Sequence, residues 1–404
     1  MPIFFHSSGF DMHLARKRPD RIVPEYSLTG DLLSFRRCAR QYRYQNGSAL
    51  PPSRPVQLWY GEFMHGLLEN VYRLWESRGG LPFPIPYTQL ALSDPIEPPK
   101  PGLPDFDLRY LGWPVEESLF NQNKRARSRK ARLAAYRRAE AAVNMLGPHL
   151  FPLIAEAEER VIGTRDIPGS LTSQQRAEKY ALTGVIDVLT ELELGTADSD
   201  NLIRRAVQAA CPDLNGEFEV IVDYKGTRRP DTGTAEWTDG EWQVQTYAWL
   251  RHEQRRSRRV AAGILVYINE LAPGEGDILA LRAALRASRT DVAAVRDSDK
   301  RMLENWRPGA RADFSPEFLF SRAVRVIPIN DASITVATGA FDQTVASIET
   351  CVQLEETAVS ILQTWVDDCK DAKTCAACDF RYFCEGYQRT GNKIGEEDTV
   401  QDEI

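Results

Sequence analysis

Two apolar, β-branched runs of the sequence each end at a carboxylate. Asp187 ends GVID, and Asp223 stands in VDYKG two residues before Lys225. Residues two apart on a strand point to the same face, so we expect Asp223 and Lys225 to project together towards Asp187 on a neighbouring strand. Carboxylates hold magnesium-like cations, which activate water for displacement at phosphorus, and an ammonium balances the developing charge. The trio predicts phosphoryl chemistry at a sheet edge; the plain alternative is a solvated Asp-x-Lys at a strand end.

Cysteines form a second group with possible chemistry. Three of the seven follow a C-x2-C-x5-C pattern: Cys375, Cys378 and Cys384. Because no secretory signal precedes them, a metal centre is a better interpretation than a disulfide framework. Cys38, on the apolar face of the first expected helix, is the best fourth ligand, and Cys369 is the nearer alternative. Four thiolates suit zinc or an iron–sulfur cluster, and the spacing alone slightly favours zinc.

Basic residues are clustered although the formal net charge is -7 and the isoelectric point is about 5.5. Residues 124–138 form one basic cluster, which contains no acidic side chain. A second basic cluster covers residues 251–259. A solvated helix face is one interpretation, and a track for a phosphate backbone is the other. The candidate DNA-binding residues of the first cluster are Lys124, Arg125, Arg127, Arg129, Lys130 and Arg132.

The overall composition is that of an ordinary globular protein. Of its 404 residues, 43% are hydrophobic and 26% charged, which is enough for a sizeable core. No apolar run approaches the roughly 18 residues of a membrane span, so we expect a cytoplasmic protein without a membrane partner. The absence of a G-x-x-x-x-G-K-[ST] loop argues against a P-loop motor, and no internal repeat is found.

Hydrophobic periodicity predicts the elements that must position these residues. The expected helices are 27–44, 58–76 with His65, 115–146 as one helix or two, 242–256, 277–306 and 341–368. The expected strands are 181–194, 216–226, 263–271 and an edge strand at 333–338, whereas 154–162 could be helix or strand. The Pro-rich residues 82–104 are expected to form an ordered loop or linker, and the acidic tail after residue 391 to be disordered.

Motifs in a fixed order give the sequence a resemblance to a known family. Cys38 comes early, followed by GEFMHGLLE with His65, GVID, VDYKG, QVQTY with Gln243 and Tyr247, and C-x2-C-x5-C. This order resembles the PD-(D/E)XK nuclease superfamily, in particular its RecB-like branch with a four-cysteine iron–sulfur cluster. That branch includes CRISPR-associated RecB-like exonucleases and AddB-type nuclease domains. The resemblance covers about residues 27 to 388, with no motif in much of 80–155 and 272–340.

The resemblance implies a role for each motif residue. His65, Asp187, Asp223 and Tyr224 would bind Mg²⁺ or Mn²⁺, and Lys225 would assist the attacking water. Gln243 and Tyr247 would help to position DNA. The resemblance also favours a 4Fe-4S cluster over zinc, with the ligands Cys38, Cys375, Cys378 and Cys384. Two features depart from the family pattern: Asp187 and Asp223 are unusually far apart, and the segment between His65 and Asp187 is long and basic.

The resulting expectation is a metal-dependent DNA nuclease that hydrolyses single strands or duplex ends, in DNA repair, recombination or anti-phage defence. The expected fold is α/β: a restriction-endonuclease-like core with a central mixed sheet flanked by helices, a helical insertion and an iron–sulfur subdomain. One alternative is a DNA-end-binding scaffold subunit of a helicase or defence complex without its own catalysis. Another is a CRISPR-adaptation-type processing nuclease with an integrase or helicase partner.

The chain is expected to divide into seven segments. These are an N-terminal extension (1–26), N-terminal helices with the first cysteine and the motif histidine (27–80), a Pro-rich loop and basic helical insertion (81–153), the nuclease core (154–271), a helical and edge-strand continuation (272–368), the cysteine segment (369–388) and an acidic tail (389–404).

Overall fold

The structure is a computed structural model of the 404-residue chain. It describes residues 23–46, 57–93, 97–99, 102, 104–168, 177–193, 200–255, 257–358, 360–367, 369, 374–375 and 378–387. The acidic tail expected to be disordered lies outside the described residues.

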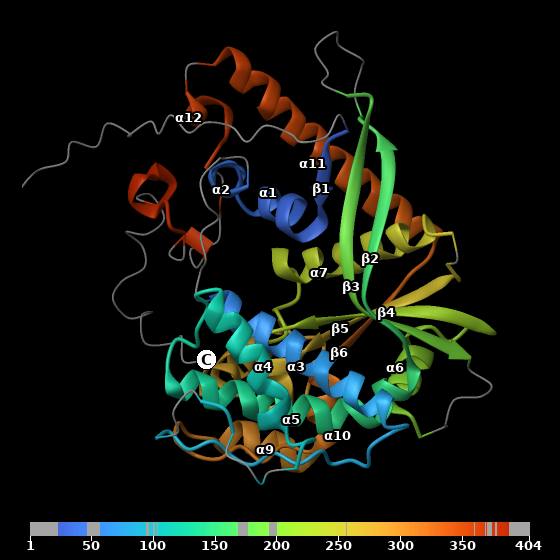
Figure 1. Ribbon diagram of the computed structural model, residues 1–404, viewed down its shortest axis with the longest axis vertical. Coiled ribbons are helices and arrows are strands. Elements are labelled where there is room, and N and C mark those ends of the chain that lie inside the picture. Colours follow the sequence, from blue (N-terminus) through green and yellow to red (C-terminus); the bar gives the residue numbers. More distant parts are fainter. Residues whose placement is uncertain are drawn as a thin grey trace, which may run out of the picture.

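A six-stranded mixed sheet forms the centre of the fold (Figure 1). Its strands are β1 (Glu25–Ser27), β2 (Ile154–Asp166), β3 (Lys179–Glu193), β4 (Glu217–Lys225), β5 (Val260–Tyr267) and β6 (Val324–Pro328). The order is β1-β3-β4-β5-β6, with β2 paired to β3. The pairs β1–β3 and β4–β5 are parallel and the other pairs are antiparallel. The predicted α/β class with a mixed sheet flanked by helices is therefore confirmed.

Helices cover both faces of the sheet. On one face, α3 (Gln57–Ser77), α4 (Leu108–Asn121) and α5 (Arg129–Leu150) share a core with β4 and β5. On the other face, α7 (Ala235–His252) and α11 (Asp331–Thr357) pack with α2 (Ala39–Gln45) and the β2–β3 hairpin. Both faces of the central strands are therefore buried under helices. This burial explains why the sequences of β4 and β5 are continuous hydrophobic runs.

Shorter elements complete the chain. They are a π-helix (Leu28–Leu33), α1 (Ser34–Arg37), α6 (Leu202–Ala210), α8 (Glu275–Arg286), α9 (Asp297–Asn305), α10 (Pro316–Ala323), α12 (Ile361–Thr364) and 3-10 turns at Phe151–Leu153, Ile268–Leu271 and Arg381–Phe383. None of the helices in the described part of the chain is long and apolar enough to cross a membrane.

The expected edge strand at 333–338 is wrong, because these residues begin α11. The Asn330 side chain accepts a hydrogen bond from the Ser333 N–H (2.9 Å), and the Asn330 N–H donates to Ser333 Oγ (3.0 Å). This reciprocal cap favours a helix over the β-branched propensity of the segment. The strand at the edge of the sheet is β6 instead.

The first expected helix is interrupted at Cys38. This residue has an extended backbone (φ -164°, ψ 111°) between α1 and α2, and its sulfur accepts from the Gln41 N–H at 3.5 Å. Cys38 therefore caps α2 rather than lying along an apolar helix face. Capping leaves its side chain beside the start of the helix, where it can meet another segment.

The expected helical segment 115–146 forms two helices, α4 and α5. The Ser128 side chain caps α5 by accepting from the Ala131 N–H (3.1 Å). The second helix extends past the expected end at residue 146, so that Pro148 lies inside α5 near its end. Across the gap, Arg132 of α5 makes a bidentate ion pair with Glu116 of α4, with both distances 2.7 Å. This buried pair fixes the two helices against each other.

Candidate metal centre and cysteine pocket

The antiparallel register of β3 and β4 brings the two motif carboxylates together. Val188 pairs with Val222, so Asp187 and Asp223 stand next to each other on adjacent strands. The Tyr224 N–H donates to Asp187 Oδ2 at 2.7 Å, which fixes that carboxylate at the end of β4. The long segment between the two strands loops away and includes α6, so it does not separate the carboxylates.

His65 reaches this group from α3. Its Nδ1 lies 3.4 Å from Asp187 Oδ1, and its Nε2 lies 3.1 Å from the Tyr224 carbonyl oxygen. Burial favours the neutral imidazole, but the nearby carboxylates, Asp187 foremost, outweigh it and raise the pKa of His65 to about 9. A metal ion at this place would displace the proton that the carboxylates now favour.

Glu158 of β2 completes a possible metal site that the sequence analysis missed. One ligand atom from each of His65, Glu158 and Asp187 lies within 4.8 Å of the others. Burial and the charge of Asp187 raise the pKa of the Glu158 carboxyl, as expected for carboxylates crowded without a cation. No spacing in the sequence marks Glu158, because it lies in an acidic run whose own secondary structure was left open.

The hairpin is distorted at this point. Glu158 has a positive φ of 55°, which costs a non-glycine residue conformational energy. On β3, Ile186 is paired with Glu159 and packs in the core with α7, whereas Val188 is paired with Ala157 and packs in the core with α3. Residues two apart on a strand normally share a face. The sheet therefore changes direction at Asp187, and this change aims both acidic side chains at His65.

Lys225 and Asp223 form a second group beside the first. Lys225 Nζ lies 2.6 Å from Asp223 Oδ2 and donates to Gln243 Oε1. Gln243 Nε2 donates to Asp223 Oδ1 (2.9 Å) and to the Tyr247 hydroxyl (3.2 Å). Gln243 and Tyr247 are only 4% and 3% exposed. Both side chains lie on the buried side of Asp223 and Lys225, and their expected role in positioning DNA stays a prediction.

Glycine at position 184 lets α7 approach closely enough to provide that support. A Cβ atom at Gly184 would lie 2.6 Å from the Tyr247 ring. Gly263 plays the same part on β5, where a Cβ would lie 2.6 Å from Val244. The glycine of GVID is thus a packing requirement that sets the position of Gln243 and Tyr247.

The donor set fits a hard divalent cation. Asp223 Oδ2 is buried without a hydrogen bond and faces only the Lys225 ammonium. Burial raises the pKa of Asp223, and the charge of Asp187 adds to this while Lys225 opposes it. Carboxylates, one imidazole and the Tyr224 carbonyl are ligands that Mg²⁺ or Mn²⁺ accepts.

The basic residues of 124–132 do not act as one surface. Arg132 is buried in its pair with Glu116, which leaves its guanidinium little exposed surface for DNA. Lys124 donates to Glu62 of α3, and Arg125 lies over the exposed Phe120 ring at 4.2 Å. Arg129 donates to the Leu92 carbonyl at 3.1 Å. The exposed basic side chains that remain are Arg125, Arg127, Arg129 and Lys130.

The motif cysteines line one pocket. Its lining includes Cys38, Cys369, Cys375, Cys378 and Cys384, together with Arg40 and Arg381. Among the described residues, no three of these sulfur atoms lie within 4.8 Å of one another. Burial raises the pKa of the Cys375 and Cys378 thiols, and the charges of Cys38 and Cys384 add to this. At Cys375 a hydrogen bond with Cys369 opposes the rise in pKa. The pocket therefore brings Cys38, near the N-terminus, together with cysteines near the C-terminus. In the described part of the chain, their sulfur atoms are not arranged as the ligands of a single ion.

Buried ion pairs hold the two halves of this pocket together. Arg40 Nε donates to the Trp365 carbonyl (3.0 Å), and its Nη1 lies 3.1 Å from Asp367. Arg43, which is fully buried, pairs with Glu355 at 2.6 Å. Glu355 also accepts from Trp365 Nε1 at 2.7 Å. These contacts fix α2, and with it Cys38, against the C-terminal segment.

Comparisons with known proteins assign no family. No family model matches the chain, and no curated protein matches it. A solved structure entitled "Crystal structure of SSO0001" aligns with 13% sequence identity, covering 81% of this chain and 96% of that chain, at a TM-score of 0.24. A likeness of this size carries no argument about fold or function.

Proposed function

We propose that the chain is a metal-dependent DNA nuclease of the PD-(D/E)XK superfamily, in its RecB-like branch, with a restriction-endonuclease-like core. The observation that carries the proposal is the convergence of His65, Glu158, Asp187 and the Asp223–Lys225 pair where β2, β3 and β4 meet α3. A purely structural role would place no chemical demand on this combination of an imidazole, three carboxylates and an ammonium, whereas metal-assisted displacement at phosphorus uses each of them.

The first group of residues binds the metal ion. His65, Glu158, Asp187, Asp223 and the Tyr224 carbonyl would hold Mg²⁺ or Mn²⁺. The bound cation supplies Lewis acidity at the scissile phosphate and lowers the pKa of water. Asp187 is held in place by the Tyr224 N–H, so its orientation is set before substrate arrives. Preorganised ligands of this kind avoid rearrangement during the reaction.

Lys225 acts on the attacking water and on the charge that develops at the phosphoryl oxygens. The Lys225 side chain is a quarter exposed, and its ammonium contacts Asp223 and Gln243. Gln243 in turn bonds Asp223 and Tyr247, so α7 positions both members of the pair. Gln243 and Tyr247 are positioning residues in this scheme.

We infer that the cysteine pocket holds a structural 4Fe-4S cluster with Cys38, Cys375, Cys378 and Cys384 as ligands. All four of these cysteines line the one pocket. The choice of an iron–sulfur cluster over zinc comes from the resemblance to the RecB-like branch, since four thiolates suit either. Arg40 and Arg381 line the same pocket and offset the negative charge of such a cluster.

The substrate we propose is single-stranded DNA or the ends of duplex DNA, in repair, recombination or defence. The test is digestion of end-labelled single-stranded and duplex DNA with magnesium or manganese. Lys225→Ala is compared with Lys300→Ala, a matched change at an exposed lysine of α9 that pairs with Asp297. We expect native protein and Lys300→Ala to cut and Lys225→Ala to be inactive. Binding without cleavage by the native protein would replace the proposal with a scaffold role in a helicase or defence complex.

A further inference from the structure

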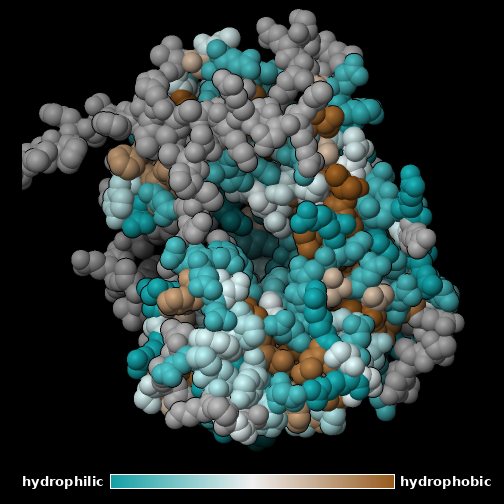
Figure 2. Space-filling model, viewed as in Figure 1, coloured by the Kyte–Doolittle hydropathy of each residue, from teal (hydrophilic) through white to brown (hydrophobic). Residues whose placement is uncertain are grey.

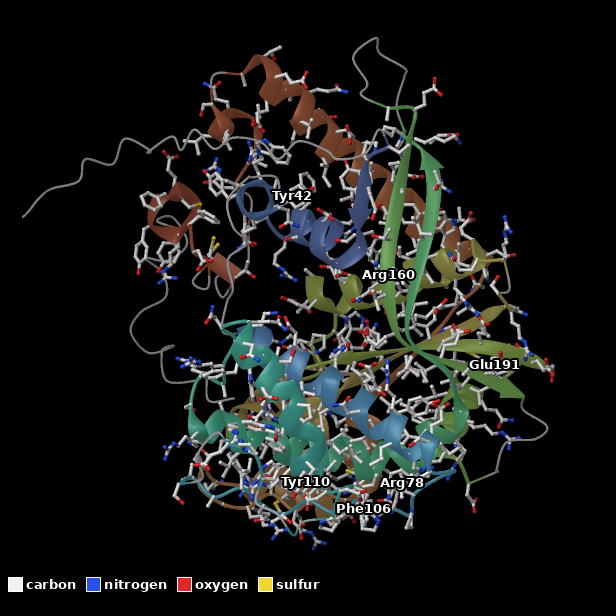
Figure 3. All side chains as sticks on the ribbon, in the orientation of Figure 1. Tyr42, Arg78, Phe106, Tyr110, Arg160 and Glu191 are labelled. Carbon is white, nitrogen blue, oxygen red and sulfur yellow. The ribbon has the colours of Figure 1, made fainter. Side chains whose placement is uncertain are left out.

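The outer face of the β2–β3 hairpin carries side chains that the chemistry above does not use. Val161 and Ile186 point into the core that the hairpin shares with α7 and α11. Because side chains alternate along a strand, Arg160 and Val185 emerge on the opposite face. They stand directly across from each other in the register of the hairpin. Figure 3 labels Arg160 on the middle part of the hairpin.

Apolar side chains accompany Arg160 on this face. Ile162 follows it by two residues and is 47% exposed, and Val185 is 37% exposed. Exposed β-branched residues on both sides of an arginine suit a ligand that alternates charge with apolar surface. A nucleic acid strand has this character, since each phosphate is followed by a sugar and a base.

The charge of Arg160 is not used within the described part of the protein. Other cations around the metal group have acidic neighbours: Lys225 pairs with Asp223, and Arg73 pairs with Glu69. Arg160 is exposed and makes no ion pair or side-chain hydrogen bond with any residue that the structure describes. An arginine fork is well suited to bind phosphate oxygens in a bidentate manner.

We propose that Arg160, Ile162 and Val185 form a strand-holding strip for single-stranded DNA beside the metal group. Arg160 binds a phosphate, and the two apolar side chains contact the adjacent sugar and base. Arg160 is two residues from Glu158 on β2. The phosphate that it binds is therefore close to the one at the metal group. Figure 2 shows a hollow lined by hydrophilic residues between the two halves of the molecule, and this hollow gives a strand room to enter. The inference rests on the proposed nuclease function.

Binding measured without cleavage tests the strip. A fluorescein-labelled single-stranded DNA oligonucleotide is titrated by anisotropy, without divalent metal, at several salt concentrations. Arg160→Ala is compared with Arg311→Ala, an exposed arginine between α9 and α10 that also lacks a described partner. Arg160→Ala should bind about tenfold more weakly at low salt and lower the slope of log Kd against log salt by about 0.7, the share of one phosphate contact. Ile162→Ser should weaken binding without changing the slope.

The outcomes separate the strip from the nuclease. If Arg160→Ala and Arg311→Ala bind like the native protein, or both lose the same amount, the strip is overturned while cleavage can still stand. If the native protein never cuts but Arg160→Ala alone changes the slope, the nuclease proposal fails and the strip stands. Native protein that binds no single-stranded DNA overturns the strip. Unchanged thermal unfolding of each variant shows that the loss of binding is not a loss of fold.

Discussion

The metal group and the cysteine pocket are held in different ways. The metal group lies on three neighbouring strands of one sheet, with α3 on one face and α7 on the other. The cysteine pocket is built from short segments that are far apart in sequence and joined by Arg40 and Arg43. A continuous sheet tolerates the loss of one polar side chain, whereas an assembly of short segments depends on each connection.

Because the two sites are held differently, substitutions in them should affect different properties of the protein: catalytic activity in one case and the free energy of unfolding in the other. Substitution at the metal group should remove activity and leave the fold, because crowded carboxylates do not stabilise the folded state without a cation. Substitution at the contacts of the pocket should lower the free energy of unfolding and leave the chemistry of the folded molecules intact. The following predictions go from the largest expected effect to the smallest.

Asp187→Asn should lower the rate of DNA cleavage by about 10³-fold or more, since a metal clamp contributes several kcal/mol to the transition state. The asparagine oxygen can still accept from the Tyr224 N–H, so the thermal unfolding midpoint should stay within a few degrees. Cleavage rates and thermal unfolding are measured on the same preparation. If Asp187→Asn lost its fold together with its activity, the claim that the metal group serves activity and not stability would be wrong.

Arg43→Met should lower the free energy of unfolding by about 3–5 kcal/mol, because it leaves Glu355 without its buried partner. The matched control is Arg36→Ala, whose half-exposed pair with Asp239 should contribute about 1 kcal/mol or less. Urea unfolding gives both values. Equal effects of the two substitutions would show that the buried pair does not hold the pocket.

Gly184→Ala should lower stability by about 1–3 kcal/mol, because the added methyl group meets the Tyr247 ring. Moving Tyr247 also moves Gln243, so cleavage should fall by about tenfold even in folded protein. Gly339→Ala is the control: its Cβ would meet nothing within 4 Å in α11, and it should be neutral or stabilising. Unchanged cleavage in Gly184→Ala would show that the position of α7 does not control the activity of the site.

Cys369→Ser should leave the brown colour and visible absorption of anaerobically purified protein unchanged, whereas Cys375→Ser should remove them. Both residues line the pocket, so this pair identifies the ligands among the five cysteines. Iron and sulfide analysis accompanies the spectra. Loss of absorption in Cys369→Ser would assign that thiol to the cluster in place of one of the four proposed.

The sequence predicted those parts of the fold that depend on local pattern. The strand that contains Asp187, the strand that ends at Lys225 and the helix carrying His65 follow from apolar periodicity, and the structure contains all three. The segment 333–338 misled because its β-branched residues favour a strand, while the Asn330 cap, three residues earlier, decides for a helix. Local propensity was overruled by a single pair of hydrogen bonds.

The candidate site was predictable only where a motif marks it. Glu158 was missed because its role depends on the register of the hairpin and on the change of sheet direction at Asp187, which no spacing encodes. The burial of Arg132 was not foreseen because its partner Glu116 lies on another helix and is visible only once α4 and α5 are placed. The sequence placed Gln243 and Tyr247 on one helix face, but it did not show that both are buried.

The central claim is that His65, Glu158 and Asp187 hold a divalent cation, and anomalous diffraction from a crystal soaked in Mn²⁺ tests it most directly. The account predicts the strongest anomalous peak between these three side chains, next to the Tyr224 carbonyl, and the loss of that peak in Asp187→Asn. A peak elsewhere, or none at these residues in the native protein, would contradict the account.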